Sequence, residues 1–130
     1  MGGFGFEDLE VYQAARQYRK KIYALVKRLP PEEKYGLAGQ MRRAAVSLTN
    51  NIAEGHGRFH YQENIQFLRH SRGSLEELLD DVNVCIDENY ADLKELSRLK
   101  EEGYQLLHKI NSYVAYLKRR KAAEKDTSAN

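Results

Sequence analysis

The chain has 130 residues, of which 42% are hydrophobic and 31% are charged, as is typical of a single globular domain and not of a chain disordered throughout. With 21 Lys and Arg residues against 19 Asp and Glu residues, the net charge is only +2, which excludes a strongly basic, histone-like binder of nucleic acids. No apolar run approaches the roughly 18 residues of a membrane span, so we expect a cytoplasmic protein that does not enter membranes.

Hydrophobic residues recur at helical spacing in four segments. The first helix is expected to run from about Asp8, a plausible N-cap, to Pro30 and Pro31, because a proline disfavours helical backbone in the preceding residue. The second runs from Leu37 to the stop signals Gly55 and Gly57. The two apolar stripes comprise Val11, Ala15, Tyr18, Ile22, Leu25 and Leu29 in the first helix and Leu37, Met41, Ala44, Ala45, Leu48 and Ile52 in the second.

The third helix is expected from Tyr61 to about Asn89, and the fourth begins near Asp92 as its cap. Their stripes are Tyr61, Ile65, Leu68, Leu75, Leu79, Val82 and Ile86, then Leu96, Leu99, Leu106, Ile110, Tyr113, Val114 and Leu117. Acidic residues are expected opposite the third stripe: Glu76, Glu77, Asp80, Asp81, Asp87 and Glu88. They form either a solvated face or one that meets a basic surface of a partner.

Helices of about 20 to 30 residues joined by connections of about four to seven residues predict an all-α fold, an antiparallel up-down-up-down four-helix bundle. Residues 1–121 are expected to form this single domain. Residues 122–130 have no apolar anchor and are expected to form a disordered C-terminal tail.

Signals for chemistry are weak. His56 and His60 have a spacing that binds metals on a helix, but the glycines around His56 predict a loop and no H-E-x-x-H pattern exists. Cys85 lies on the flank of an apolar stripe, as a partly buried structural thiol does. We expect no catalytic residue, no cofactor and no metal ion, and therefore no enzyme.

Residues 42–58 read RRAAVSLTNNIAEGHGR, and a polar line lies opposite the apolar stripe of this helix. The line comprises Arg43, Ser47, Thr49, Asn50 and Glu54, with Asn51 on its flank. An ordinary solvated face favours Lys and Glu, which are better helix formers. Small polar residues instead favour contact with another subunit or with nucleic acid, and a weakly selected exposed face is the alternative.

Further residues point to contacts outside the chain. Tyr12 and Tyr23 lie outside the stripe of the first helix, and tyrosine is enriched at interfaces. Gly73 lies on the outer side of the third helix, where it costs about 1 kcal/mol relative to alanine unless another backbone approaches closely. The predicted oligomer interface is Ser47, Asn50, Asn51, Glu54, Gly73, Tyr12 and Tyr23. The predicted phosphate contacts are Arg19, Lys20, Arg42, Arg43, Arg58, Lys118, Arg119 and Arg120.

Three motifs carry a resemblance to a known family. Residues 43–58 follow R-x-A-x-S-x-x-x-N-I-A-E-G-x-x-R, residues 6–12 read FEDLEVY, and residues 73–78 read GSLEEL. Together they resemble the 23S rRNA intervening-sequence protein family over about residues 6–118. Thr49, His56 and His60 depart from the usual pattern, and none of the three changes the expected fold.

The resemblance implies a bacterial four-helix bundle that assembles as a homopentamer around a central channel, with no catalytic residues assigned. We therefore expect a non-enzymatic oligomer that binds RNA or a ribonucleoprotein. The alternative is an accessory adaptor that binds the reverse transcriptase of a diversity-generating retroelement and its RNA. A structural bundle that binds no nucleic acid is a third possibility.

Overall fold

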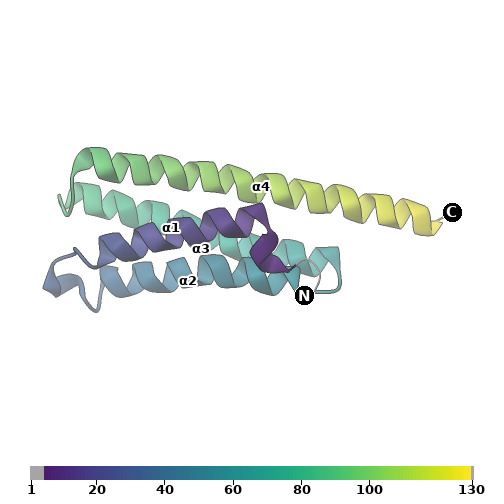
Figure 1. The fold of residues 1–130 in the computed structure, drawn as a ribbon, viewed down its shortest axis with the longest axis horizontal. Helices are drawn as coiled ribbons and strands as arrows, with labels where there is room; N and C mark the ends of the chain where they lie inside the picture. Colours follow the sequence, from purple (N-terminus) through teal and green to yellow (C-terminus); the bar gives the residue numbers. More distant parts are fainter. Residues whose placement is uncertain (1–4, 130) are drawn as a thin grey trace.

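The computed structural model describes the backbone of residues 5–129 and the side chains of residues 5–125. Every regular element in that part is helical, and four long helices pack as a bundle (Figure 1). These are α1 (Glu10–Val26), α2 (Leu37–His56), α3 (Tyr61–Asp87) and α4 (Leu93–Ala129), with the single 3₁₀ turns η1 (Phe6–Asp8) and η2 (Pro31–Glu33) on either side of α1. The all-α prediction is confirmed, and none of the described helices is long and apolar enough to cross a membrane.

The predicted apolar stripes form one core. The largest fully buried side chains include Ile22, Met41, Leu48, Leu75 and Ile110, which come from all four helices. Only the stripe residues at the edge of the core are half-buried: Leu29, Tyr61, Ile86 and Tyr113. Helical spacing was sufficient to identify these residues because burial of apolar area drives the packing of each helix.

Of the two N-cap residues expected from the sequence, one caps its helix and the other does not. Asp92 caps α4, since its Oδ2 accepts a hydrogen bond from the Glu95 backbone N–H at 3.2 Å. Asp8 does not cap α1, which begins at Glu10. Its Oδ2 instead accepts a hydrogen bond from the Gly5 backbone N–H at 3.0 Å and closes η1, a turn that helical periodicity is too coarse to predict.

Helix α4 extends past the predicted end of the bundle (Figure 1). A disordered tail was expected over residues 122–130, but the helix continues to Ala129, and Asn130 lies outside the described residues. The physical reason is local. Residues 121–125 are Lys, Ala, Ala, Glu and Lys, all strong helix formers, so the helix continues although no side chain described after Leu117 is buried.

Tyr12 was expected on an outer face, and the structure corrects this. Its side chain is only 9% exposed, and the ring of Phe6 packs edge-on against it with centroids 4.9 Å apart. The turn η1 places Phe6 there, so a segment outside the four helices covers Tyr12. The ring offers little area to another copy of the chain.

One acidic residue of α3 is also buried. Asp81 was expected on the charged outer face, but it is 6% exposed and its Oδ2 has no hydrogen-bond partner in the described part of the chain. The buried face of α3 is wider than its apolar stripe because α3 packs against both α2 and α4. Asp81 is buried on that face together with Leu78 and Cys85, and the Cys85 thiol is fully buried.

Candidate functional site

A shallow hollow of about 530 Å³ lies on the outer side of α2 and reaches α1. We call it the α2 hollow, and its lining residues are Tyr23, Arg42, Arg43, Val46, Ser47, Asn50 and Asn51. Six of these seven residues were singled out from the sequence, two as phosphate contacts and four as interface residues. The structure therefore brings the two predicted kinds of contact together on one surface.

The two arginines of the α2 hollow supply its charge. Arg43 is exposed and Arg42 is half-buried. The ion pairs of the described side chains involve other cations, namely Lys21, Arg28, Arg58 and Lys109, so no carboxylate neutralises Arg42 or Arg43 there. A guanidinium without a carboxylate partner offers all its N–H donors to an incoming anion.

One polar residue of the α2 hollow, Ser47, links α2 to α3, and Asn51 bonds back to it within α2. The hydroxyls of Ser47 and Ser74 are hydrogen-bonded at 2.8 Å, and Asn51 Nδ2 donates to the Ser47 carbonyl oxygen at 2.8 Å. Next to them, the buried Ser71 hydroxyl donates to the Leu48 carbonyl oxygen at 2.7 Å. Ser47 and Asn51 are half-buried and line the α2 hollow, and the Ser47 hydroxyl also serves the packing of α2 on α3.

Thr49 is likewise not on the outer face. It is 1% exposed, and its hydroxyl oxygen accepts a hydrogen bond from Arg19 Nη1 at 2.7 Å across the α1–α2 contact. Arg19 and Tyr23 are four residues apart and therefore share one side of α1, which places Arg19 beside the α2 hollow. Lys20 is exposed on α1, and no described contact connects it to the hollow.

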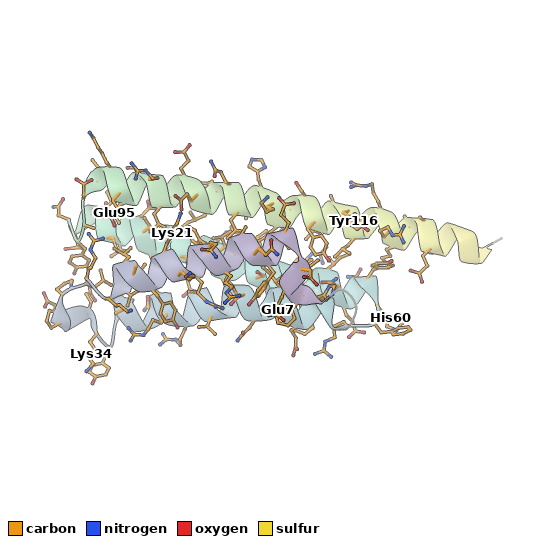
Figure 2. The ribbon with its side chains drawn as sticks, viewed as in Figure 1. Glu7, Lys21, Lys34, His60, Glu95 and Tyr116 are labelled. Carbon is orange, nitrogen blue, oxygen red and sulfur yellow. The ribbon has the colours of Figure 1, made fainter. Side chains whose placement is uncertain are left out.

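The remaining predicted cations lie toward the end of the bundle where α2 joins α3, the end that His60 marks in Figure 2. The Arg58 guanidinium lies 4.8 Å from the centre of the Phe67 ring, and its Nη2 is 3.5 Å from Glu54 Oε1. Lys118, Arg119 and Arg120 are exposed on α4, and a hydrogen bond with Tyr61 raises the pKa of Arg120. These cations form a second group beyond the α2 hollow.

Three predicted interface residues keep an exposed position. Asn50 and Glu54 lie on the outer side of α2, and Gly73 lies on the outer side of α3. A Cβ added at Gly73 would meet no atom within 4 Å, so nothing inside the chain requires glycine there. Tyr23 is half-buried against the core.

The histidines and Cys85 do not form a metal site in the described part of the chain. Among the described residues, no three His, Cys, Asp or Glu side chains lie close enough together to hold a metal ion. His56 is the last residue of α2, not a loop residue as the neighbouring glycines suggested, because Gly55 and Gly57 are both compatible with helical backbone. Burial raises the pKa of the Cys85 thiol to about 11, the opposite of what a nucleophile needs.

One comparison with known proteins gives a result. A family model described as 23S rRNA-intervening sequence protein matches residues 7–112, well over half of the chain. The match includes the whole α2 hollow, all of α1, α2 and α3, and α4 as far as Ser112. No curated protein matches the chain.

Proposed function

The chain belongs to the 23S rRNA-intervening sequence protein family, and from this we propose that it is a cytoplasmic, non-enzymatic protein that binds RNA as an assembly of several copies. The α2 hollow is the primary contact. Arg42 and Arg43 bind phosphates there, with Arg19 beside them. Arg58, Lys118, Arg119 and Arg120 form the second contact.

The observation that carries this proposal is that the two arginines in the α2 hollow are not paired with carboxylates in the described part of the chain. They face an open, otherwise uncharged surface and have no carboxylate partner among the described side chains. Phosphate binding by arginine is electrostatic, so it needs unpaired guanidinium groups more than it needs a high net charge. Several copies in one assembly multiply the site, so a chain with a net charge of +2 can hold RNA.

The assembly we propose is a ring of five copies, each an up-down-up-down bundle. The contacts of Ser47 with Ser74, and of Gly55 with Asn64, support opposite directions for α2 and α3. Charge complementarity supports association: residues 61–90 carry two basic and seven acidic residues, a net −5, while the rest of the chain is net basic. Asn50, Glu54 and Gly73 are the exposed residues through which copies meet.

Replacing both Arg42 and Arg43 with alanine is expected to weaken RNA binding and its dependence on salt. Each phosphate contact with single-stranded RNA contributes about 0.7 to the slope of log K against log salt, so the double variant should lose about 1.4 of that slope. The measurement is the affinity for a labelled single-stranded RNA at several salt concentrations.

The matched control replaces Lys21 and Arg28 with alanine. This variant loses the same charge, but its two cations are paired with Glu102 and Glu95 in the wild-type chain. Its slope should stay close to that of the wild type. Equal slopes for both double variants would mean that only net charge matters, and absence of RNA binding at low salt would contradict the proposal in favour of the adaptor role.

Gly73→Ala is expected to separate folding from assembly. Within one chain the new methyl group meets nothing, so alanine should stabilise α3 by about 1 kcal/mol. Between copies it should hold two surfaces apart and shift the mass in sedimentation velocity toward the single chain. An unchanged assembly with a raised melting temperature would show that this face of α3 is simply exposed to solvent.

A further inference from the structure

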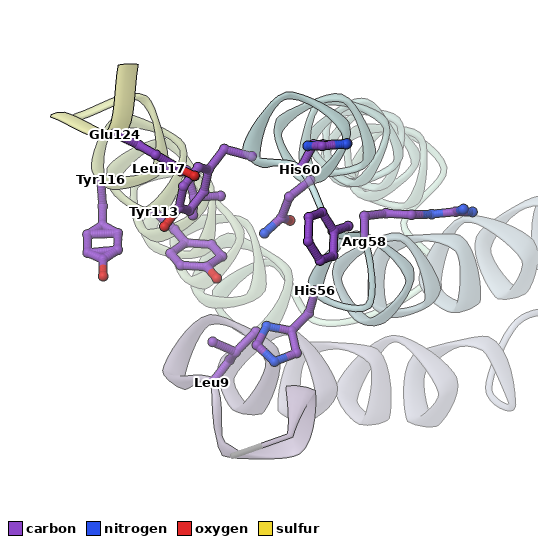
Figure 3. A pocket seen from close by; sticks show the side chains of 11 residues that line it. Leu9, His56, Arg58, His60, Tyr113, Tyr116, Leu117 and Glu124 are labelled. Atoms are coloured by element: carbon purple, nitrogen blue, oxygen red, sulfur yellow. The ribbon is translucent and has the colours of Figure 1, made fainter. Parts of the chain in front are cut away.

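An open cleft of about 660 Å³ lies at the end of the bundle, where the α2–α3 connection meets α4 (Figure 3). We call it the end cleft and define it by five ring-bearing residues and one cation: Phe59, His60, Tyr61, Tyr113, Tyr116 and Arg58. The rings come from two segments far apart in the sequence. This cleft is distinct from the α2 hollow, with which it shares no lining residue.

The rings of the end cleft leave aromatic faces open. Phe59 is 95% exposed, and its ring stands edge-on to His60 with centroids 5.2 Å apart. On the α4 side, the ring centroids of Tyr113 and Tyr116 are 6.1 Å apart, and the two ring planes are only 12° from parallel. The Tyr116 side chain is 44% exposed. A single exposed phenylalanine needs no explanation, but several exposed rings gathered at one cleft point to a ligand that covers them.

The charge beside these rings favours an anionic ligand. Arg58 borders the cleft, and Lys121 and Lys125 line the adjoining surface together with Phe59 and His60. Lys121 is held near the start of α3, because its Nζ donates to Gln62 Oε1 at 2.6 Å. Two carboxylates lie at this edge, Glu124 and the Glu54 that pairs with Arg58, so the three cations outnumber them.

Exposed aromatic rings next to cations match the chemistry of a nucleotide, which has a planar base and an anionic phosphate. Unpaired nucleobases stack on aromatic side chains, while the phosphates that flank them pair with arginine and lysine. Bases inside a duplex are already stacked on each other and have no free face to offer. A purely apolar peptide would leave the cations without a partner.

We propose that the end cleft binds unpaired bases of single-stranded RNA, which stack on Phe59 and Tyr116 while Lys121 and Lys125 hold the flanking phosphates. This inference rests on the proposed RNA-binding function and adds to it a preference for single strands. The cleft and the α2 hollow then bind different parts of one strand.

The test uses a short single-stranded RNA that carries one 2-aminopurine, whose fluorescence is quenched when the base stacks. Wild-type protein should quench the signal on binding. Phe59→Ala and Tyr116→Ala should each bind about tenfold more weakly and lose most of the quenching, since stacking on one aromatic side chain is worth about that factor. Both side chains are exposed, so we expect both variants to fold.

The matched control is Tyr35→Ala. Tyr35 is 88% exposed beside a lysine, since Lys34 Nζ lies 5.3 Å from its ring centre, but it lies in the α1–α2 connection, at the other end of the bundle (Figure 2). This variant should bind and quench like the wild type. A duplex of the same sequence should compete poorly, and so should adenosine monophosphate, which lacks the neighbouring phosphates.

The other outcomes overturn the inference in distinguishable ways. If the Phe59 and Tyr116 variants bind and quench like the wild type while the Arg42 and Arg43 variant does not, the end cleft is not a base site but the proposed function stands. If the monophosphate competes as well as RNA, the cleft takes free nucleotides. If quenching is lost together with a fall in the assembled mass, the cleft is a contact between copies, and if no RNA binds at all, both proposals fail.

Discussion

Gly55→Ala is expected to lower the free energy of unfolding by about 2 kcal/mol, against the usual effect of alanine in a helix. A Cβ built at Gly55 would lie 2.6 Å from Asn64 Oδ1, 2.9 Å from Phe67 Cβ and 3.1 Å from the Asn64 carbonyl oxygen. The last two atoms belong to or adjoin the α3 backbone, so α2 and α3 must move apart. Overpacking of this kind costs about 1–3 kcal/mol, and the clash with backbone atoms puts this substitution at the upper end of that range. Alanine is a better helix former than glycine, which offsets about 1 kcal/mol of the cost.

Thermal unfolding followed by circular dichroism checks this, and the melting temperature should fall by about 7 °C. Gly73→Ala is the control, because it makes the same chemical change on an open helix surface. Both variants are compared at a dilution where sedimentation shows single chains, since assembly makes melting depend on concentration. A rise in melting temperature for Gly55→Ala as large as that for Gly73→Ala would show that α2 and α3 pack less closely there.

The second large effect is expected at Asp81. Burial, followed by the nearby charges of Glu77 and Asp80, raises the pKa of this carboxyl from 3.8 to about 6. The fold therefore favours the protonated form, so this group's contribution to stability is fully present below pH 3.8 and is lost as the pH rises through 6. Asp81→Asn, which stays neutral, should gain about 1 to 2 kcal/mol over the wild type at pH 8 and almost nothing at pH 4, after allowance for partial screening of the carboxyl by solvent.

Melting temperatures at pH 4 and pH 8 test this expectation. Glu76→Gln is the control, because Glu76 is an exposed carboxylate of α3 that is not among the charges raising the pKa of Asp81. Its melting temperature should change little with pH relative to the wild type. A loss of stability in Asp81→Asn at pH 8 would contradict the expectation and would mean that the carboxylate has a cationic partner supplied by another copy of the chain.

The core could be predicted from the sequence because each stripe is a property of one helix. The spacing of Ile22 and Leu25, or of Leu48 and Ile52, is sufficient to show that one face is apolar and must be buried. Tyr12 could not be placed this way, because it is covered by Phe6 from η1, a turn too short to have a period. The extension of α4 to Ala129 was missed for a related reason: lack of apolar residues predicts exposure, not loss of helix.

Most residues that line the α2 hollow were singled out from the sequence, but the contacts that they make were not predicted. Arg42, Arg43 and Asn50 lie in the α2 hollow as the helical wheel of α2 suggests. Ser47, however, lies where α2 and α3 meet, and Asp81 is buried. A wheel drawn for one helix does not show which flank its neighbour covers. Such roles depend on the register between two helices.

The burial of Cys85 gives the protein a built-in reporter of its own motions. It is the only cysteine in the chain, it is fully buried in the core, and its raised pKa keeps the thiolate scarce at neutral pH. An alkylating reagent can modify it only while α3 is open to solvent, so the labelling rate counts opening events of the core. Fraying of the exposed end of α4 leaves this count unchanged, and a partner that clamps α3 slows it. Labelling of Cys85 thus reports opening of the bundle near the connection between α3 and α4, far from the exposed C-terminal end of α4.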